Sequence, residues 1–137
     1  MKKQTIIFIV ILILLGILSV RNAKAEAPLA DMSVPTEIQD NPIKVFAYNQ
    51  VKYRWGDGYW NAFNNIIEHE SKWDCTSQNP NSTAYGCGQF LNSTWKDTGY
   101  SKTENPEIQI MATIQYIANR YKDPRKAWQF WSINRFY

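Results

Sequence analysis

Hydrophobic residues recur at helical spacing between Gly58 and Trp73, which predicts an amphipathic helix. At about 100° per residue, one side of this helix gathers the apolar side chains of Trp60, Phe63, Ile66, Ile67 and Trp73. Asp57 is placed to cap the start of the helix. Glu70 falls in the middle of the apolar stripe, whereas Glu68 falls on the opposite face, where a solvated acid is expected. The pattern therefore separates two nearby carboxylates by environment.

The second half of the chain carries the start and stop signals of further helices. Asn105 followed by Pro106 is typical of a helix start, and the apolar spacing continues to Tyr121. Asp123-Pro124 ends that helix and begins another. The chain is predicted to form a loop at 79–84 and a short helix at 91–97. The aromatic segment at 45–55 has an ambiguous period, so its structure is left open. With no repeat and no convincing hairpin, the sequence predicts a mainly α fold: one small helical domain with little or no sheet.

The N-terminus has the pattern of an export signal. Lys2 and Lys3 precede a weakly polar to apolar run over residues 5–20, and the run is followed by the small-residue site Ala23-Lys24-Ala25. We expect residues 1–25 to be a signal peptide, with an uncleaved N-terminal anchor as the alternative. Residues 26–44 are proline-containing and aperiodic and are predicted to be a linker or arm, which leaves 45–137 as the domain.

Charge and composition narrow the function classes. The chain has 137 residues and a formal net charge of +3, but residues 1–25 contain four Lys or Arg and no acid, so the remainder carries −1. A nucleic-acid-binding function therefore loses its electrostatic support, and membrane contact is expected only through the N-terminal segment. An exported protein is indicated: periplasmic, cell-wall-associated or secreted. Most of the aromatic residues should be core, although large rings also suit stacking on sugars.

Cys75 and Cys87 are the two cysteines of the chain, and an even count in an exported domain favours a disulfide. Two free thiols are the alternative. Two cysteines and one histidine cannot supply the four ligands of a closed zinc site, and His69-Glu70 lacks the second histidine of a metalloprotease motif. The sequence thus predicts no metal and no cofactor.

A carboxylate centred on an apolar stripe is costly unless it is protonated or paired. Burial would raise the pKa of Glu70, and a raised pKa suits a general acid near neutral pH. Cleavage of a glycosidic bond needs such an acid to protonate the leaving oxygen. A buried glutamate that is merely paired with a cation or with the backbone would give the same pattern.

Two ordered motifs carry a family resemblance. They are Glu70-Ser71-Lys72-Trp73, and Tyr85-Gly86-Cys87-Gly88-Gln89-Phe90 followed by Ser93-Thr94-Trp95. Together they resemble the lysozyme-like lytic transglycosylases, and the second motif is similar to that of resuscitation-promoting-factor domains. A later run, from Asn105-Pro106 through Gln109-Ile110 and Ala127-Trp128 to Tyr137, resembles transglycosylase-like domains of phage and secreted wall enzymes. The resemblance covers roughly residues 55–137.

The resemblance implies an α+β lysozyme-like fold with a substrate groove. Glu70 matches the single catalytic glutamate, Gln89 the glutamine that contacts substrate on the groove floor, and Tyr85 and Gly86 the pair that shapes the groove edge. The implied substrate is peptidoglycan, cleaved at the β-1,4 bond between N-acetylmuramic acid and N-acetylglucosamine. In this family the glutamate acts first as acid and then as base, and the muramic 6-hydroxyl closes a 1,6-anhydro ring.

Departures from the family pattern leave alternatives open. Cys87 and Gly88 replace bulkier apolar residues, and residues 130–132 replace a Tyr-Asn-Ala-Gly type of ending. Trp131 is therefore expected either to stack on a sugar or, more in keeping with its type, to pack in the core.

A second carboxylate would favour plain hydrolysis by a lysozyme-type muramidase. Asp74 and Asp97 are the candidates. Asp74, four residues after Glu70, would share its helical side if the helix continued that far, and a hydrogen bond at the helix end is the ordinary alternative. His69 is expected at the surface or in a hydrogen bond. A non-catalytic wall-binding or assembly module is a further alternative. The small size also suits a partner role in an envelope-spanning secretion or conjugation machine.

Overall fold

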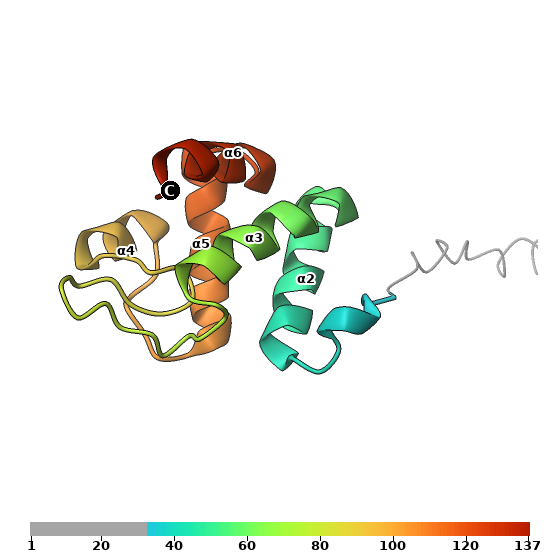
Figure 1. The fold of residues 1–137 in the computed structure, drawn as a ribbon, viewed down its shortest axis with the longest axis horizontal. Helices are drawn as coiled ribbons and strands as arrows, with labels where there is room; N and C mark the ends of the chain where they lie inside the picture. Colours follow the sequence, from blue (N-terminus) through green and yellow to red (C-terminus); the bar gives the residue numbers. More distant parts are fainter. Residues whose placement is uncertain (1–32) are drawn as a thin grey trace, which may run out of the picture. The chain divides into compact units, whose positions relative to one another are not determined.

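Seven helical segments make up the regular structure of residues 33–137, the part of the chain that the computed structural model describes (Figure 1). They are η1 (Thr36–Ile38), α2 (Pro42–Trp55), η2 (Asp57–Tyr59), α3 (Trp60–Glu70), α4 (Asn92–Thr98), α5 (Pro106–Arg120) and α6 (Pro124–Asn134). Within this part there is no strand, and two isolated antiparallel bridges join Tyr85 to Gln78 and to Phe90. The prediction of a small, mainly helical lysozyme-like domain with little or no sheet is confirmed.

The helix α2 begins inside the stretch that was predicted to be a linker. Its first turn is capped by Asn41, whose side-chain oxygen accepts hydrogen bonds from the backbone N–H groups of Ile43 and Lys44, each at 3.0 Å. Ile38, before the helix, is buried in the core. The compact unit therefore begins at Val34 rather than at residue 45. The predicted signal peptide (1–25) and residues 26–32 lie outside the described residues.

Asp57 does not cap α3, contrary to the sequence prediction. Residues Asp57–Tyr59 form a separate 3-10 turn, and no side chain caps α3. The carboxylate of Asp57 instead accepts a hydrogen bond from the Tyr48 hydroxyl at 2.8 Å and pairs with the Lys52 ammonium at 3.3 Å. These contacts tie the start of α3 back to α2.

The helix α3 ends at Glu70, three residues before the predicted end. Lys72 and Trp73 adopt left-handed backbone conformations, with φ of 53° and 65°, which turns the chain away from the helix axis. The Trp73 ring consequently packs back against Trp60, with ring centroids 5.9 Å apart, and its N–H donates to the side chain of Asn64 at 3.0 Å. Trp73 is buried as the apolar stripe predicted, although it is not helical.

The helix α5 is the central element of the domain. It contacts α2, α4 and α6, and its buried residues occupy more than one face. In Figure 1, α5 (orange) passes behind α3 (green), while α2 and α4 lie to either side. The predicted start at Pro106 is confirmed, with the Asn105 side chain accepting from the N–H of Ile108. Asp123 caps α6 in the same way, through the N–H of Lys126.

Candidate functional site

Glu70 is the last residue of α3 and lies where α3 packs against α6. Its side-chain Oε1 accepts a hydrogen bond from the indole N–H of Trp131 at 2.7 Å. Trp131 was expected either to stack on a sugar or to pack in the core. Its side chain is 7% exposed, so the ring is a buried partner of the carboxylate.

The surroundings of Glu70 favour its protonated form. Burial raises the pKa of this carboxyl above its ordinary value, and this effect outweighs the hydrogen bond from Trp131 and the charge of His69, which act in the opposite direction. The apolar stripe of α3 is the cause of the burial, as the sequence pattern predicted. A raised pKa moves a carboxyl group toward the range in which it can act as a general acid.

Glu70 opens onto a cavity of about 270 Å³. The lining residues come from the end of α3, the segment before α4, α4 itself and the C-terminal segment: Glu70, Gly88, Gln89, Phe90, Leu91, Thr94, Phe136 and Tyr137. Glu70 is the sole carboxylate side chain among them. The structure therefore brings together the two residues that the motifs singled out first, Glu70 and Gln89.

Gln89 is held in an unusual conformation beside this cavity. Its φ is 49°, a left-handed value that is uncommon for a residue other than glycine. Its side-chain amide donates to the backbone carbonyls of Ser77 at 3.0 Å and Gly86 at 2.9 Å. Such strained residues cluster at functional sites. Because both amide hydrogens are used by the backbone, the oxygen Oε1 is the atom left to bind a hydroxyl or N–H group.

Gly86 does not line the cavity but packs against Gln109, a buried residue of α5. Its φ is 83°, and a Cβ at this position would overlap Oε1 of Gln109 and lie 2.7 Å from its Cδ. Gln109 is 1% exposed and fixed at both ends of its amide. It accepts from the Cys87 N–H at 2.7 Å and donates to the carbonyls of Cys75 at 3.1 Å and Thr103 at 3.0 Å.

Gly86→Ala is expected to destabilise the domain by about 3 kcal/mol or more, because it combines backbone strain with the loss of a buried hydrogen-bond network. Gly99→Ala is the matched control. Gly99 also has a positive φ, 79°, but nothing lies within 4 Å of its added Cβ, so its cost should be about 1 kcal/mol. Chemical denaturation of both variants measures the difference. Equal losses of unfolding free energy in the two variants would show that the contact with Gln109 adds nothing to the cost of Gly86→Ala.

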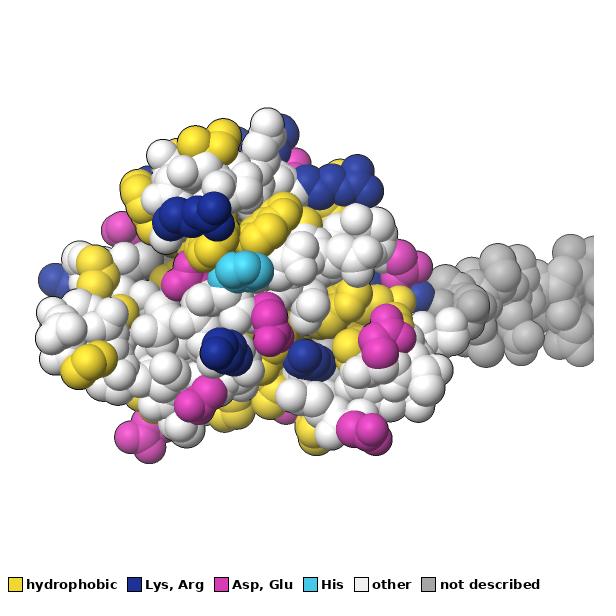
Figure 2. Space-filling model, viewed as in Figure 1, with side chains coloured by type: hydrophobic (Ala, Val, Ile, Leu, Met, Phe, Trp, Pro, Cys, Tyr) yellow, Lys and Arg dark blue, Asp and Glu magenta, His cyan; other side chains and the backbone are white. Residues whose placement is uncertain are grey.

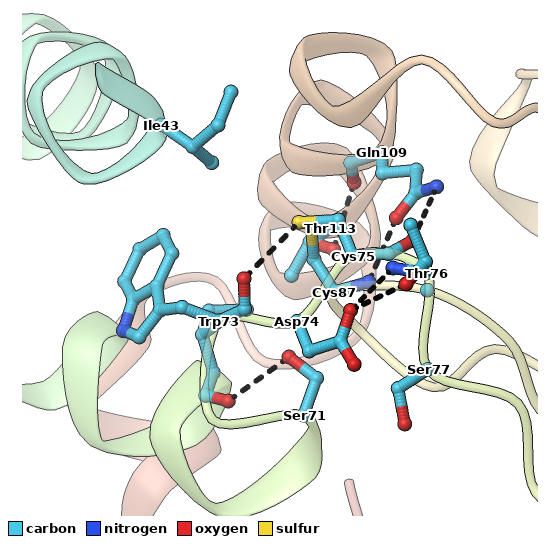
Figure 3. Close-up of a disulfide and its surroundings, with 12 residues drawn as sticks. Ile43, Ser71, Trp73, Asp74, Cys75, Thr76, Ser77, Cys87, Gln109 and Thr113 are labelled. Atoms are coloured by element: carbon cyan, nitrogen blue, oxygen red, sulfur yellow. Dashed lines mark hydrogen bonds between the residues drawn. A yellow bond between two sulfur atoms is a disulfide. The ribbon is translucent and has the colours of Figure 1, made fainter. Parts of the chain in front are cut away.

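A disulfide joins Cys75 to Cys87, which confirms the favoured sequence prediction (Figure 3). It links the turn after α3 to the segment that carries Gln89. Figure 3 shows the Gln109 amide reaching both cysteines from α5. The disulfide and the buried amide therefore hold the same two loop segments together. Cys87 is fully buried against this amide.

Removing the disulfide by the double change Cys75→Ala and Cys87→Ala is expected to cost about 3 kcal/mol, the loop-closure entropy of a 12-residue separation. Denaturation midpoints of the oxidised protein, the reduced protein and the variant provide the measurement. The reduced protein should behave like the variant. Rapid alkylation of both thiols in the native, unreduced protein would contradict the bond.

Tyr85 lies away from the Glu70 cavity. Its backbone N–H donates to the Phe90 carbonyl at 3.2 Å, while its ring lies 5.2 Å from the ammonium of Lys102. It lines a separate cavity of about 420 Å³. The motif residue Tyr85 thus belongs to the edge of the loop region, and the structure does not bring it to Glu70.

The candidates for a second carboxylate do not line the cavity. Asp74 was predicted to share a helical side with Glu70 if the helix continued, but α3 ends first and Asp74 is exposed. The hydroxyl and N–H of Thr76 hydrogen-bond to its carboxylate and lower its pKa. Asp97 is exposed on α4.

His69 and Glu68 are surface residues, as expected. The His69 ring nitrogen Nδ1 lies 2.8 Å from the Asn65 carbonyl, and the ring is 4.6 Å from that of Trp131. Figure 2 shows the histidine (cyan) against hydrophobic side chains (yellow) on this face. Glu68 is exposed and lies 3.7 Å from the Lys44 ammonium.

Sequence reasoning missed two contributors to this region. Gln109 and Tyr137 both occur in the motif run but received no role, and only the polarity of Gln109 within a buried helical face could have marked it. Tyr137 donates a hydrogen bond to the Gly88 carbonyl at 3.2 Å, and burial raises its pKa well above the ordinary value. No local pattern connects residues 49 positions apart.

Residues 33–137 contain no group of three or more His, Cys, Asp or Glu side chains that could hold a metal ion. Across the same residues, no helix has the length and apolar character needed to cross a membrane.

The fold and the site define a class: a small helical domain in which one half-buried glutamate with a raised pKa opens onto a cavity. The Transglycosylase SLT domain family matches residues 49–132, more than half of the chain. The chain belongs to this family, as its motifs indicated, and the family is one of peptidoglycan-binding, lytic transglycosylase-type wall-cleaving domains. No curated protein and no solved structure matches the chain.

Proposed function

We propose that the chain is an exported lytic transglycosylase that cleaves the β-1,4 bond between N-acetylmuramic acid and N-acetylglucosamine, with Glu70 as acid and then base. Family membership supports the substrate class. The observation that carries the proposal is the raised pKa of Glu70 in a cavity that it shares with Gln89. These are the two motif residues to which the family resemblance gives the chemistry.

The chemistry needs one carboxyl group and no water. Protonated Glu70 transfers its proton to the glycosidic oxygen as the bond from that oxygen to the muramic C1 breaks. The resulting carboxylate then takes the proton of the muramic 6-hydroxyl while O6 bonds to C1 and closes the 1,6-anhydro ring. Glu70 is protonated again at the end, so one residue completes the cycle. The substrate's acetamido group can stabilise the positive charge at C1 between the two steps.

Trp131 is proposed to hold the carboxyl group of Glu70 in its working orientation. Because the indole N–H donates to Oε1 at 2.7 Å, Oε1 serves as an acceptor and the acid proton is carried on Oε2. The same bond becomes stronger when Glu70 is ionised, since a charged acceptor strengthens a hydrogen bond. Trp131 thus stabilises the ionised form of Glu70, while burial keeps the pKa of Glu70 above its ordinary value.

Gln89 is proposed to bind the substrate through its side-chain oxygen. The amide nitrogen is fixed to two backbone carbonyls, which pre-orients the oxygen without further loss of side-chain entropy. Gly86 and Tyr85 are proposed to act less directly, Gly86 by letting Gln109 approach and Tyr85 by shaping the outer edge.

Hydrolysis by a lysozyme-type muramidase is the alternative reaction. It would be favoured by a second carboxylate, or a base that activates water, across the substrate from Glu70. Neither Asp74 nor Asp97 lines the cavity, which favours the intramolecular route. A non-catalytic binding module would have no need for a proton-bearing glutamate on an otherwise apolar stripe.

The deciding experiment is mass spectrometry of fragments released from purified peptidoglycan by residues 26–137. Fragments with 1,6-anhydro ends are expected. Reducing ends that incorporate ¹⁸O from labelled water would show hydrolysis and overturn the transglycosylase assignment. A folded protein that binds peptidoglycan without releasing fragments would support the binding-module alternative.

Export is proposed from the N-terminal pattern of basic start, apolar run and small-residue site. The protein would then act in the periplasm or at the cell wall, either free after cleavage at Ala25 or held by residues 1–25 as an anchor. A local role beside a secretion or conjugation machine fits the small size of the domain. N-terminal sequencing of the protein recovered from cells distinguishes the cleaved form from the anchored form.

A further inference from the structure

A second polar cavity lies on the other side of α4 from Glu70. It has a volume of about 490 Å³ and is lined by Asn92, Trp95, Lys96, Gly99, Tyr100, Ser101 and Lys102. The charged side chains among these residues are the two lysines. The cavity therefore has a net positive lining and no acid of its own.

Neither lysine is neutralised by a neighbouring acid. Within the described residues, no carboxylate lies within 4.0 Å of either ammonium group. The Lys102 ammonium is instead held by neutral partners: the Asn92 side-chain oxygen at 3.1 Å and the ring of Tyr85 at 5.2 Å. Lys102 is thus oriented while its full charge remains available to an anion.

Trp95 forms part of the same cavity wall. Its side chain is 3% exposed, and in the described part of the chain the indole N–H has no hydrogen-bond partner. That N–H is itself enclosed by protein atoms, so it does not reach a ligand in the cavity. The charged groups of the cavity are therefore the two ammonium groups of Lys96 and Lys102, which favour ligand oxygens that carry negative charge.

The helix α4 connects this cavity to the proposed catalytic site. Leu91 and Thr94 line the Glu70 cavity, while Asn92, Trp95 and Lys96 line the second one. A glycan strand bound at Glu70 would therefore contact the same helix, α4, that carries Lys96 into the second cavity. Muramic acid carries a peptide stem, and such stems end in free carboxylates, which match the donors of the cavity.

We propose that the cavity of Lys96 and Lys102 binds carboxylates of the peptide stem on the strand that is cleaved at Glu70. This inference rests on the proposed function. It makes the enzyme selective for peptide-bearing over peptide-free glycan strands. The lysines position the strand and take no part in proton transfer.

The test compares cleavage of two substrates, both freed of phosphate-containing wall polymers: strands that bear stems, and strands from which an amidase has removed them. Lys96→Gln with Lys102→Gln is expected to lower the ratio of kcat/KM for stem-bearing over stem-free strands by about tenfold. Lys122→Gln with Lys126→Gln removes the same charge from exposed positions near the start of α6 and should leave the ratio unchanged. A ratio unchanged by the first pair, or lowered equally by the second, would overturn the proposal.

Binding measured in a Glu70→Gln background separates this inference from the proposed function. Sedimentation with stem-bearing and stem-free strands should show the same loss of preference in the Lys96 and Lys102 variant, whether or not the parent cleaves them. A lysine effect confined to walls that retain phosphate polymers would overturn the inference, since the cavity would then bind phosphate.

Discussion

Glu70→Gln is expected to lower the rate of peptidoglycan cleavage by about 10²–10⁴-fold, the usual contribution of a general acid. Gln has the same shape as Glu but cannot transfer a proton to the glycosidic oxygen. Its side-chain oxygen still accepts the hydrogen bond that Trp131 donates at 2.7 Å. The change therefore removes the chemistry and leaves the local contacts in place. Release of anhydro-ended fragments, followed by mass spectrometry, is the measurement.

The stability of the Glu70→Gln variant provides the first control. The pKa of Glu70 is raised in the folded protein, so the folded state binds the proton of this carboxyl group more tightly than the unfolded state does. Stability is then lost as pH rises from the unfolded pKa through the folded pKa, and the ionised carboxylate disfavours the folded state at neutral pH. Gln is free of this penalty, so the melting temperature at pH 7 should be unchanged or higher.

Glu68→Gln is the matched control for activity. Glu68 lies two residues away on the same helix but is exposed, and its carboxylate lies 3.7 Å from the Lys44 ammonium. Its replacement should leave cleavage within about twofold, because exposed pairs of this kind contribute little. Full activity of Glu70→Gln alongside full activity of Glu68→Gln would exclude Glu70 as the acid.

Local signals predicted the parts of the fold that depend on a few neighbouring residues. The starts of α5 and α6 follow from Asn105-Pro106 and Asp123-Pro124, where the cap and the proline act within one turn. The burial of Glu70 follows from the apolar spacing of α3. These features need no information from the rest of the chain.

The features that sequence reasoning missed depend on distant contacts. The buried residues of α2, Ala47, Tyr48 and Val51, share one face, but Tyr53 on the same helix is 92% exposed, so the aromatic residues do not mark that face and the period was ambiguous. The end of α3 is set by the packing of Trp73 on Trp60.

The hydrogen bond between Glu70 and Trp131 spans 61 positions, and no spacing rule connects them. The role of Gln109 is equally non-local, since it contacts Cys75 from 34 positions away. The sequence could therefore single out Glu70 but could not identify the groups that contact it.

Trp131→Phe is expected to lower kcat by about 10–100-fold, because the carboxyl group of Glu70 loses the donor that fixes its orientation. Phe keeps most of the buried ring and removes the N–H. The variant should remain folded, with a modest loss of stability from the smaller side chain. A loss of binding without a change in kcat would indicate instead that Trp131 contacts the sugar.

Trp128→Phe is the matched control. Trp128 stacks on Trp131 at 5.2 Å between ring centroids, with an interplanar angle of 13°, but makes no hydrogen bond to Glu70. Its replacement should affect packing without moving the acid. Equal effects of the two variants on kcat would show that only packing is involved.

The pH dependence of kcat/KM separates positioning from packing most directly. The alkaline limb reports the loss of the acid proton from Glu70 in the free enzyme. The Trp131 hydrogen bond lowers the pKa of Glu70 against the larger effect of burial, so its removal should raise that pKa further and move the alkaline limb to higher pH. A packing defect alone would lower the whole profile without moving it. An alkaline limb that stays in place, or moves to lower pH, would therefore contradict the assignment of Trp131 as the residue that orients the acid.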